Sequence, residues 1–432
     1  MKLLFFFLIF CLSLNCYGQN QTSFQEAILL KNVTVIDGLG NPPKQSSFVL
    51  IQGGKITGIY QAFPKKLLQS IKEVDLTGKY LIPGLMDAHV HLSAAPPKMI
   101  DSIMQFAFQS GITGVRDMGG DGIVLKELSQ KASDKNLPVP RIYFSSVFAG
   151  KSWMQNDGRA KSSAHGFEAG NQDWLKSIDS QINISEAVQN AKKFGCTGIK
   201  IYADLSYELV QAIVEEARKV KIKVWSHSTI FPIKPRDAVK AGVNVLSHSE
   251  YLLYEGADTV PQTYHTQRNV PYPDSTKVFS QALFDLFAEM KKKNVFLDAT
   301  LYVTQVRERM SSSNPQSVKA AKWTYQLTSL ANKNGVKVIA GTDLMGMPGR
   351  DSISNIHVEM KLLVTNAGFI PLEAIRAATY YNAMACGIED EFGSIEVGKI
   401  ADLVVLDADP SVNIDNTKKI AIVIKNGVMF KK

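Results

Sequence analysis

The chain has 432 residues, of which 45% are hydrophobic and 20% are charged. This length and composition exclude a disordered, collagen-like or coiled-coil protein and suit a large enzyme barrel with an accessory module. The net charge is +8, but the longest basic cluster is residues 291–293, so we predict a dispersed basic surface and no nucleic-acid partner. Four cysteines are too few for a disulfide scaffold, and we predict that Cys196 and Cys386 are buried thiols.

The N-terminus has the form of an export signal. A short basic start precedes an almost unbroken apolar run over residues 3–14, which is too short to span a bilayer as a helix. We predict that residues 1–18 are a signal peptide cleaved before Gln19, and that the protein is exported to the periplasm or secreted. In the alternative interpretation Cys16 is a lipidated N-terminus, which would attach the protein to a membrane.

Strand-like segments lie near both ends of the chain. Residues 29–36 alternate β-branched and apolar side chains between glycines, and the same pattern returns in residues 401–406 and 420–424. We therefore predict that residues 27–82 and 394–432 pair with each other and form one small β-sandwich domain.

Between these ends, short apolar strands alternate with helical stretches such as residues 206–220 and 279–293. Eight such units are typical of an α/β fold of the (β/α)₈ TIM-barrel type, which we assign to residues 83–393. The expected strands are residues 84–91, 114–118, 141–145, 198–203, 223–227, 243–248, 295–301 and 336–343.

Four histidines lie at the C-terminal ends of predicted strands. His89 and His91 are two residues apart on the first strand, so both imidazoles face the same side. His227 closes the fifth strand, His248 the sixth, and Asp343 ends the eighth. Catalytic side chains converge at this face of a barrel, and imidazole and carboxylate bind zinc and similar ions. These five residues are therefore candidate metal ligands.

Lys200 lies on the fourth predicted strand. A free ammonium cannot bind a metal, but burial beside two cations would push this lysine toward its neutral amine. That amine could capture carbon dioxide as a carbamate, whose two oxygens can bridge two ions. A lysine paired with a nearby acid is the alternative interpretation.

With these residues, the chain resembles the amidohydrolase superfamily, in the branch of imidazolonepropionase-like and prolidase-like proteins. The resemblance extends from about residue 27 to the C-terminus. Besides the residues above, the segments that show it are residues 81–91, 341–343 and 393–406.

The resemblance implies a binuclear centre, most simply with two zinc ions and carbon dioxide as the Lys200 carbamate. The first-strand histidine pair would hold one ion with Asp343, and His227 and His248 would hold the other. Lys200 would bridge the two ions. Imidazolonepropionase uses one metal and has no lysine at the fourth strand, so Lys200 favours the prolidase-like side.

Two such ions can share a water and lower its pKa to about 7. Asp343 would then act as the general base and pass the proton to the leaving nitrogen. We expect hydrolysis of an amide-type C–N bond in a small molecule such as a dipeptide with C-terminal proline or an N-acyl amino acid. The alternatives are a mononuclear cyclic amidohydrolase or deaminase, and an inactive barrel that serves as a binding protein. A homo-oligomer is compatible with the sequence.

Further residues are candidates for catalysis and substrate binding. Tyr202 follows Lys200 by two residues, so it faces the barrel interior and is a candidate catalytic or substrate-binding residue, with simple packing as the alternative. Asp117 ends the second strand and is expected to accept a hydrogen bond from a ligand histidine. His357 and Arg350 are candidate substrate contacts.

Two connections are longer than usual and rich in aromatic and polar residues, namely residues 151–184 and 251–279. Long loops at this face of a barrel commonly select the substrate. Like Arg350, Arg159 and Arg268 in these loops could meet a substrate carboxylate.

Overall fold

The computed structural model describes residues 27–63, 71–269 and 272–431. The predicted signal peptide at residues 1–18, including Cys16, lies outside this range. Among the described residues, no helix is both long and apolar enough to cross a membrane.

The larger sheet is a parallel barrel. Its strands are hydrogen-bonded in the order β6-β7-β8-β10-β11-β12-β13-β14, and β9 (Leu175–Ile178) adds to β8. The first and last strands are joined by Ala88 N to Ala340 O at 3.0 Å and by Asp343 N to His89 O at 2.8 Å. The barrel strands are β6 (Leu85–Val90), β7 (Ile112–Asp117), β8 (Arg141–Gly150), β10 (Gly198–Ile201), β11 (Lys223–His227), β12 (Val245–Ser247), β13 (Phe296–Asp298) and β14 (Val338–Ile339).

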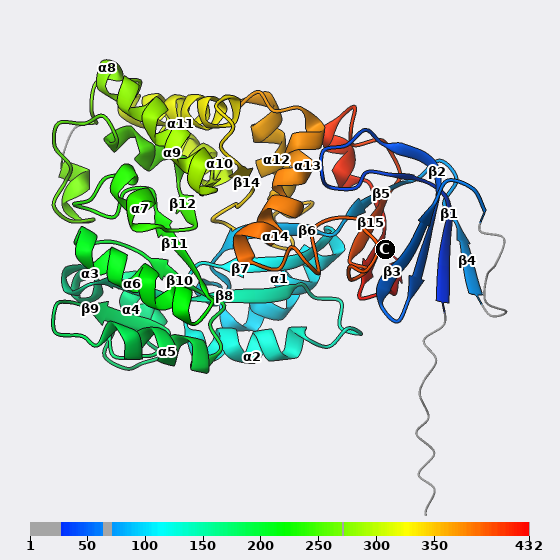
Figure 1. Cartoon of the computed structure of the whole chain (residues 1–432), viewed down its shortest axis with the longest axis horizontal. Helices are drawn as coiled ribbons and strands as arrows, with labels where there is room; N and C mark the ends of the chain where they lie inside the picture. The colour runs from blue at the N-terminus through cyan, green and yellow to red at the C-terminus, as the bar shows by residue number, and fades with distance from the viewer. Residues whose placement is uncertain (1–26, 64–70, 270–271, 432) are drawn as a thin grey trace, which may run out of the picture.

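All eight predicted strands are present, and the predicted barrel is confirmed. Helices connect the strands and surround them in Figure 1. They are α1 (Pro97–Gln109), α2 (Gly122–Ala132), α3 (Lys151–Asn156), α4 (Gly158–Ser163), α5 (Ile184–Phe194), α6 (Tyr207–Lys219), α7 (Pro235–Ala241), α8 (Ser275–Val278), α9 (Gln281–Lys293), α10 (Leu301–Met310), α11 (Pro315–Lys333), α12 (Ile356–Thr365), α13 (Pro371–Ala377) and α14 (Tyr380–Cys386).

Helix α6 illustrates why these segments fold as they do. The Ser206 hydroxyl accepts from Leu209 N at its N-terminus, which satisfies a backbone donor that the helix itself leaves free. Its buried side chains recur at helical spacing, so one face of the helix packs on the barrel and the other meets solvent. Those buried residues are Val210, Ile213, Val214 and Ala217.

The two chain ends build one β-rich domain, as predicted. Antiparallel pairing of β15 with β5 joins the C-terminal strands to the N-terminal ones, in the order β17-β16-β15-β5-β1-β2-β3, and β4 pairs with β1. These strands are the blue and red arrows of Figure 1. They are β1 (Ala27–Val35), β2 (Lys44–Gln52), β3 (Lys55–Tyr60), β4 (Ile71–Asp75), β5 (Tyr80–Pro83), β15 (Leu403–Leu406), β16 (Ile420–Lys425) and β17 (Val428–Lys431).

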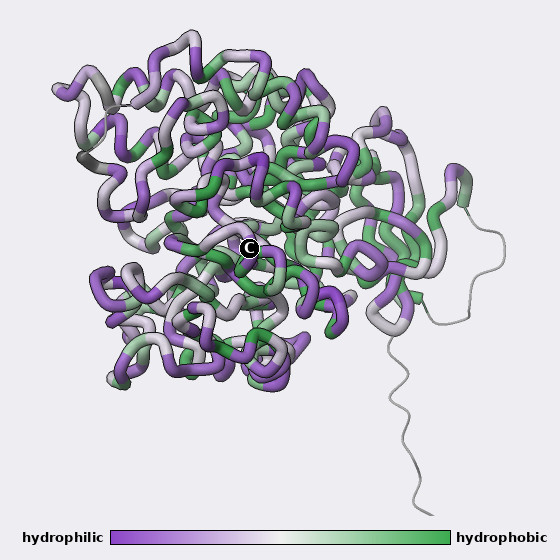
Figure 2. The backbone as a smooth tube through the Cα atoms, turned by 60° about the vertical axis from the view of Figure 1, so that its left-hand side comes forward, coloured by the Kyte–Doolittle hydropathy of each residue, from purple (hydrophilic) through white to green (hydrophobic). Residues whose placement is uncertain are grey.

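Each part has its own apolar interior, and Figure 2 shows hydrophobic segments gathered inside while many outer turns are hydrophilic. The β-rich domain contacts the barrel near the beginning of its strands. There Asp402 pairs with Arg141, the first residue of β8, and Phe430 packs edge-on against Phe108 of α1. The C-terminal ends of the barrel strands are thus left free to form a site. Cys196 and Cys386 are buried free thiols, as predicted.

Candidate active site

The residues singled out at the strand ends line one cavity of about 450 Å³. They come from the ends of β6, β10, β11, β12 and β14, which are far apart in the sequence. The structure therefore brings together all six predicted metal ligands, namely His89, His91, Lys200, His227, His248 and Asp343.

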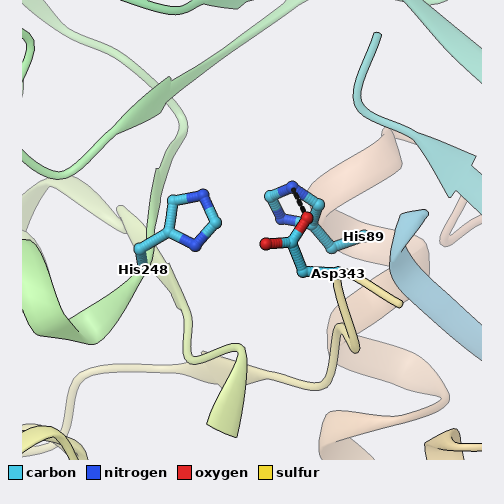
Figure 3. Close-up of side chains that lie close together, drawn as sticks. All are labelled: His89, His248 and Asp343. Carbon is cyan, nitrogen blue, oxygen red and sulfur yellow. Dashed lines mark ion pairs between the residues drawn. The ribbon is translucent and has the colours of Figure 1, made fainter. Parts of the chain in front are cut away.

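His89, His248 and Asp343 lie closest together. One ligand atom of each lies within 4.8 Å of the others, and Figure 3 shows the Asp343 carboxylate between the two imidazoles. The Oδ1 atom of Asp343 is 3.5 Å from Nε2 of His89 and 3.2 Å from Nε2 of His91. The His227 ring centroid is 4.8 Å from that of His248. Asp343 is thus the acidic group around which His89, His91 and His248 gather.

Asp343 is held in this position by its neighbours at the end of β14. Asp87 accepts from Thr342 N at 3.0 Å and from Thr342 Oγ1 at 2.7 Å. Gly341 permits the approach of β14 to β6, because a Cβ atom there would lie 2.6 Å from the Cβ atom of His89. The glycine and the Asp87–Thr342 contacts therefore fix where the Asp343 side chain enters the cavity.

The histidines are oriented through their Nδ1 atoms. His89 Nδ1 lies 2.7 Å from Asp298 Oδ2, and His91 Nδ1 lies 2.7 Å from the Gly119 carbonyl oxygen. Both oxygens are acceptors, so each Nδ1 carries a proton, and each Nε2 faces Asp343 Oδ1. Such contacts orient imidazoles toward a metal.

The expected partner Asp117 does not contact a histidine ring, which corrects the prediction. Its carboxylate accepts from Leu92 N at 2.7 Å and Gly119 N at 3.1 Å, where it shapes the turn after β7. The acceptor for His89 is Asp298, which the sequence analysis missed. Asp298 ends β13, but the strand predicted there covers residues 295–301, so the strand-end pattern does not single it out.

Asp298 is itself fixed by a buried network. Arg116 Nη2 donates to its Oδ2 atom at 2.9 Å, and Ser247 Oγ donates to the same atom at 3.0 Å. Burial tends to raise the pKa of Asp298, but the charges of His89 and Arg116 hold it below its usual value. A carboxylate is thus present beneath His89.

Lys200 is 1% exposed, and its Nζ atom has no hydrogen-bond partner among the described residues. Burial lowers the pKa of Lys200 to about 7. The Nδ1 atom of the buried His227 likewise has no partner. Buried polar atoms ordinarily have partners. A neutral amine and an imidazole with free ligand atoms, beside a carboxylate, fit a divalent-ion centre that includes a lysine carbamate.

The charge states also suit metal binding. Burial, together with the neighbouring Lys200, lowers the pKa of His227 well below its usual value, and burial lowers that of His248 similarly. Burial would raise the pKa of Asp343, but the charge of His89 and a hydrogen bond from His91 hold it well below its usual value. Neutral imidazoles at His227 and His248 therefore coexist with an ionised Asp343 carboxylate at neutral pH.

Tyr202 lines the cavity, as expected. Its ring stacks on Trp153 with centroids 4.3 Å apart and meets His227 edge-on at 4.2 Å. Its hydroxyl accepts from Arg159 Nη1 at 2.5 Å, and Arg159 is paired with Asp157. Helices α3 and α4, which follow β8, thus supply an aromatic side chain and a cation to the cavity wall.

Arg307 of α10 is a second cation in the cavity that the sequence analysis missed. Its guanidinium lies 3.8 Å from Asp343 Oδ2 and 3.1 Å from Glu250 Oε2. Arg307 lies about two helical turns into α10, and no sequence motif near it indicates a place in the cavity. Arg350 also lines the cavity but pairs with Asp351 at 3.1 Å, and the Arg268 side chain lies outside the described residues.

His357 does not line the cavity, so its predicted substrate contact is wrong. It is buried in α12, where Nδ1 lies 2.9 Å from Thr417 Oγ1 and Nε2 lies 2.9 Å from the Ser110 carbonyl oxygen. Both ring nitrogens therefore join the barrel wall to the C-terminal segment rather than facing the site.

The fold and this arrangement of side chains define a barrel hydrolase. The amidohydrolase family model matches residues 80–429, and the chain belongs to the amidohydrolase family. This family is generally metal-dependent, and the enzymes related to this chain act on small molecules.

Among curated proteins, the chain is 23% identical over 372 residues to the imidazolonepropionase of Thermoplasma acidophilum, which covers 83% of this chain and 82% of the relative. Among solved structures, a Xaa-Pro dipeptidase with methionine bound in its active site aligns with a TM-score of 0.74 at 22% identity, over 94% of this chain and 100% of the other. The ochratoxinase of A. niger aligns with a TM-score of 0.73 at 22% identity, over 94% and 96%. These structural likenesses show the fold.

Proposed function

We propose that the protein is a metal-dependent hydrolase with a binuclear centre that cleaves an amide-type C–N bond of a small carboxylate-bearing substrate. The observation that carries this proposal is the meeting of four imidazoles, the Asp343 carboxylate and the unpartnered Lys200 amine in one cavity. The residues that would hold the ions are His89, His91, Lys200, His227, His248 and Asp343.

Two bound divalent ions would supply Lewis acidity toward the scissile carbonyl and a nucleophile at neutral pH. The chain itself prepares the site, because Asp298 and the Gly119 carbonyl hold the imidazoles of His89 and His91 with Nε2 toward Asp343. The Asp343 carboxylate accepts a proton from the attacking water and passes it to the leaving nitrogen.

Lys200 is suited to become a carbamate. Its neutral amine can attack carbon dioxide, forming an N–C bond and releasing one proton, and the product is an anion. The lowered pKa, caused by burial, supports this step because an appreciable share of the amine is uncharged near pH 7. The carbamate would replace the positive charge of the lysine with two oxygen atoms that can bind metal ions.

The cavity suits a substrate with a carboxylate and an apolar group. Arg307 and Arg159 place two guanidiniums in its wall, and guanidiniums bind carboxylates well. Trp153, Tyr202 and Tyr264 supply aromatic surface beside them. The volume of about 450 Å³ lies in the range of small-molecule sites. A dipeptide or N-acyl amino acid meets these requirements, and the likeness to a Xaa-Pro dipeptidase agrees with it.

A mononuclear cyclic amidohydrolase is the second candidate. The compact group of His89, His248 and Asp343 would by itself supply three ligands to one ion. The match to an imidazolonepropionase over most of both chains agrees with this alternative.

The test is to strip the protein with a chelator, reload it with zinc, and measure metal per chain together with hydrolysis. The panel contains Xaa-Pro dipeptides, N-acyl amino acids, their C-terminal amides and cyclic amides. We expect two ions per chain and at least tenfold higher kcat/KM for free acids than for matched amides. Arg307→Ala should remove that preference. One ion per chain with turnover of cyclic amides alone would favour the second candidate, and absence of metal binding would refute both.

We also propose that the mature protein begins near Gln19 and lies outside the cytoplasm, on the grounds of the basic start and short apolar run in residues 1–18. N-terminal sequencing of the protein from its native host tests this. A cytosolic protein with Met1 intact would contradict it, and a lipid on Cys16 would establish the membrane-attached form.

A further inference from the structure

The N-terminus of α10 is capped in an unusual way. Thr300 is its N-cap residue, a position where a threonine hydroxyl normally accepts from a backbone N–H of the first turn. Here the Thr300 side chain makes no such bond. Its Oγ1 atom instead lies 3.0 Å from Nδ1 of His248. The Thr300 hydroxyl therefore contacts His248 of the site instead of capping its own helix.

Glu359 supplies the missing cap from another helix. Its side chain is fully buried in the first turn of α12, which lies beside α10 in Figure 1. Oε1 accepts from Leu301 N at 3.0 Å, and Oε2 accepts from Tyr302 N at 2.6 Å. A carboxyl group at this place satisfies two backbone donors that the helix itself leaves free.

The backbone at Thr300 shows that this arrangement is imposed. Its φ is +51° and its ψ is +47°, a left-handed conformation that β-branched residues rarely adopt. Such a conformation persists only where the surroundings determine it. Glu359 fixes the two residues that follow Thr300, and so holds the turn that directs the Thr300 hydroxyl to His248.

Helix α10 also carries Arg307, whose guanidinium lies 3.8 Å from Asp343 Oδ2. The position of this one helix therefore governs two sides of the cavity, the His248 ring at its N-terminus and the cation two turns later.

We propose that Glu359 is a positioning residue of the metal centre: by capping α10 in place of Thr300, it frees the Thr300 hydroxyl to orient His248 and fixes Arg307 beside Asp343. This inference rests on the proposed function, because it takes His248 to be a metal ligand. Residues that hold ligand histidines typically change metal affinity 10–100-fold when they are replaced.

The first experiment compares Glu359→Gln with Glu373→Gln. Burial raises the pKa of Glu359 well above its usual value, yet in either protonation state both oxygens can accept a hydrogen bond, whereas glutamine offers one oxygen. Glu373 also accepts from a backbone N–H at a helix N-terminus, that of Ile370 at 3.0 Å in its own helix α13, but α13 contributes no residue to the cavity. It is therefore a matched control for the loss of a helix cap.

We expect both variants to lower Tm by a few degrees, since each weakens one helix end. Glu359→Gln should also weaken zinc binding about tenfold and change the visible absorption spectrum of the Co²⁺-loaded protein. Glu373→Gln should leave zinc affinity within about twofold and the Co²⁺ spectrum unchanged. If Glu359→Gln does not fold, Glu359→Asp, which shortens the reach of the carboxylate, takes its place.

The second experiment tests the route through Thr300. Thr300→Val keeps the branched shape but removes the hydroxyl, so zinc affinity should fall about 10–100-fold. Thr300→Ser keeps the hydroxyl and should remain within about threefold of the original affinity. Thr300→Val combined with Glu359→Gln should lose little more affinity than Thr300→Val alone, because both act on the same contact.

The outcomes separate this inference from the function on which it rests. Failure of the original protein to bind zinc or Co²⁺ would refute the proposed centre itself. Normal metal binding by the original protein, with Glu359→Gln lowering only Tm in the manner of Glu373→Gln, would overturn the positioning role of Glu359 alone. Independent, additive losses in the double variant would also overturn it.

Discussion

Lys200 and Lys425 are both buried, but the protein surrounds them in opposite ways. Lys425, where the β-rich domain meets the barrel, donates to the carbonyl oxygens of Ala132, Asp134 and Leu137 at 2.9, 3.0 and 3.2 Å. Lys200, in the cavity at the other end of the barrel, has an Nζ atom with no partner among the described residues. A buried charge costs free energy unless it is paired. The satisfied lysine therefore stabilises the fold, whereas the unsatisfied one indicates a site for chemistry.

The aspartates of the same two regions differ in the same way. Asp402 pairs with Arg141 and accepts from Asn426 N at 2.7 Å. Its negative charge is therefore balanced by a guanidinium and a backbone N–H, which keep their protons at any ordinary pH. Asp343 faces His89 and His91, whose ring nitrogens can bind either protons or metal.

The two regions also differ in backbone strain, which is greater at the cavity than at the domain contact. The left-handed residues at the domain contact include Gly111 after α1 and the pair Asn426 and Gly427 in the turn between β16 and β17, where this conformation costs little. At the cavity end of the barrel, His248, Thr300 and Asp343 follow three successive strands with φ values of 70°, 51° and 58°. These residues adopt that conformation at a cost, which is typical of functional sites.

The largest expected effect is that of Lys200→Ala on turnover. Without the bridging group, the protein should lose one or both ions and at least about 10⁴-fold in kcat, which corresponds to about 5.5 kcal/mol. Added short carboxylates should restore part of the activity. Metal analysis and steady-state kinetics check this, and a variant with two ions and full turnover would contradict the bridging role.

Next in size is the effect of Asp343→Asn, which keeps one oxygen ligand but cannot accept the proton. Turnover should fall by roughly 10² to 10⁴, the usual reach of acid–base catalysis, while metal content changes little. Asp402→Asn should instead lower Tm and leave kcat of the folded protein within about twofold. If fully loaded Asp343→Asn keeps kcat within about threefold, another group is the base.

The third prediction concerns stability of the metal-free protein. Lys425→Met should lower the free energy of unfolding by about 1–3 kcal/mol, because three carbonyls lose their donor. Lys200→Met should raise it by about 1–3 kcal/mol, because it removes an unpartnered buried amine. Denaturant titrations of both variants check this, and equal destabilisation would remove the contrast between the two lysines.

The last prediction concerns the pH dependence of that stability, whose effect is smallest when taken per pH unit. Burial lowers the pKa of Lys200 from 10.5 to about 7, so between these values the unfolded chain holds a proton that the folded chain lacks. The free energy of unfolding should therefore rise with pH across this window, by at most about 1.4 kcal/mol per pH unit. The advantage of Lys200→Met should shrink from pH 7 to pH 10 and stay constant below pH 7. An advantage independent of pH would refute a lowered pKa.

The sequence by itself determined the eight barrel strands and the location of the cavity residues. Apolar strands alternating with amphipathic helices specify the barrel, since each segment buries its apolar side in the same way along the chain. The positions of His89, His227, His248 and Asp343 followed because they end strands, and parallel strands bring all such ends to one face. Lys200 was singled out by its position on the fourth predicted strand.

Only the tertiary structure decided which side chains meet. Asp298 rather than Asp117 contacts a ring, Arg307 enters the cavity, and His357 turns away from it. Glu359 reaches the N-terminus of α10 across 58 positions of sequence. Such contacts depend on strand register and on the rotation of each helix against its neighbours. Those quantities are set by packing of the whole barrel, so no local pattern of residues contains them.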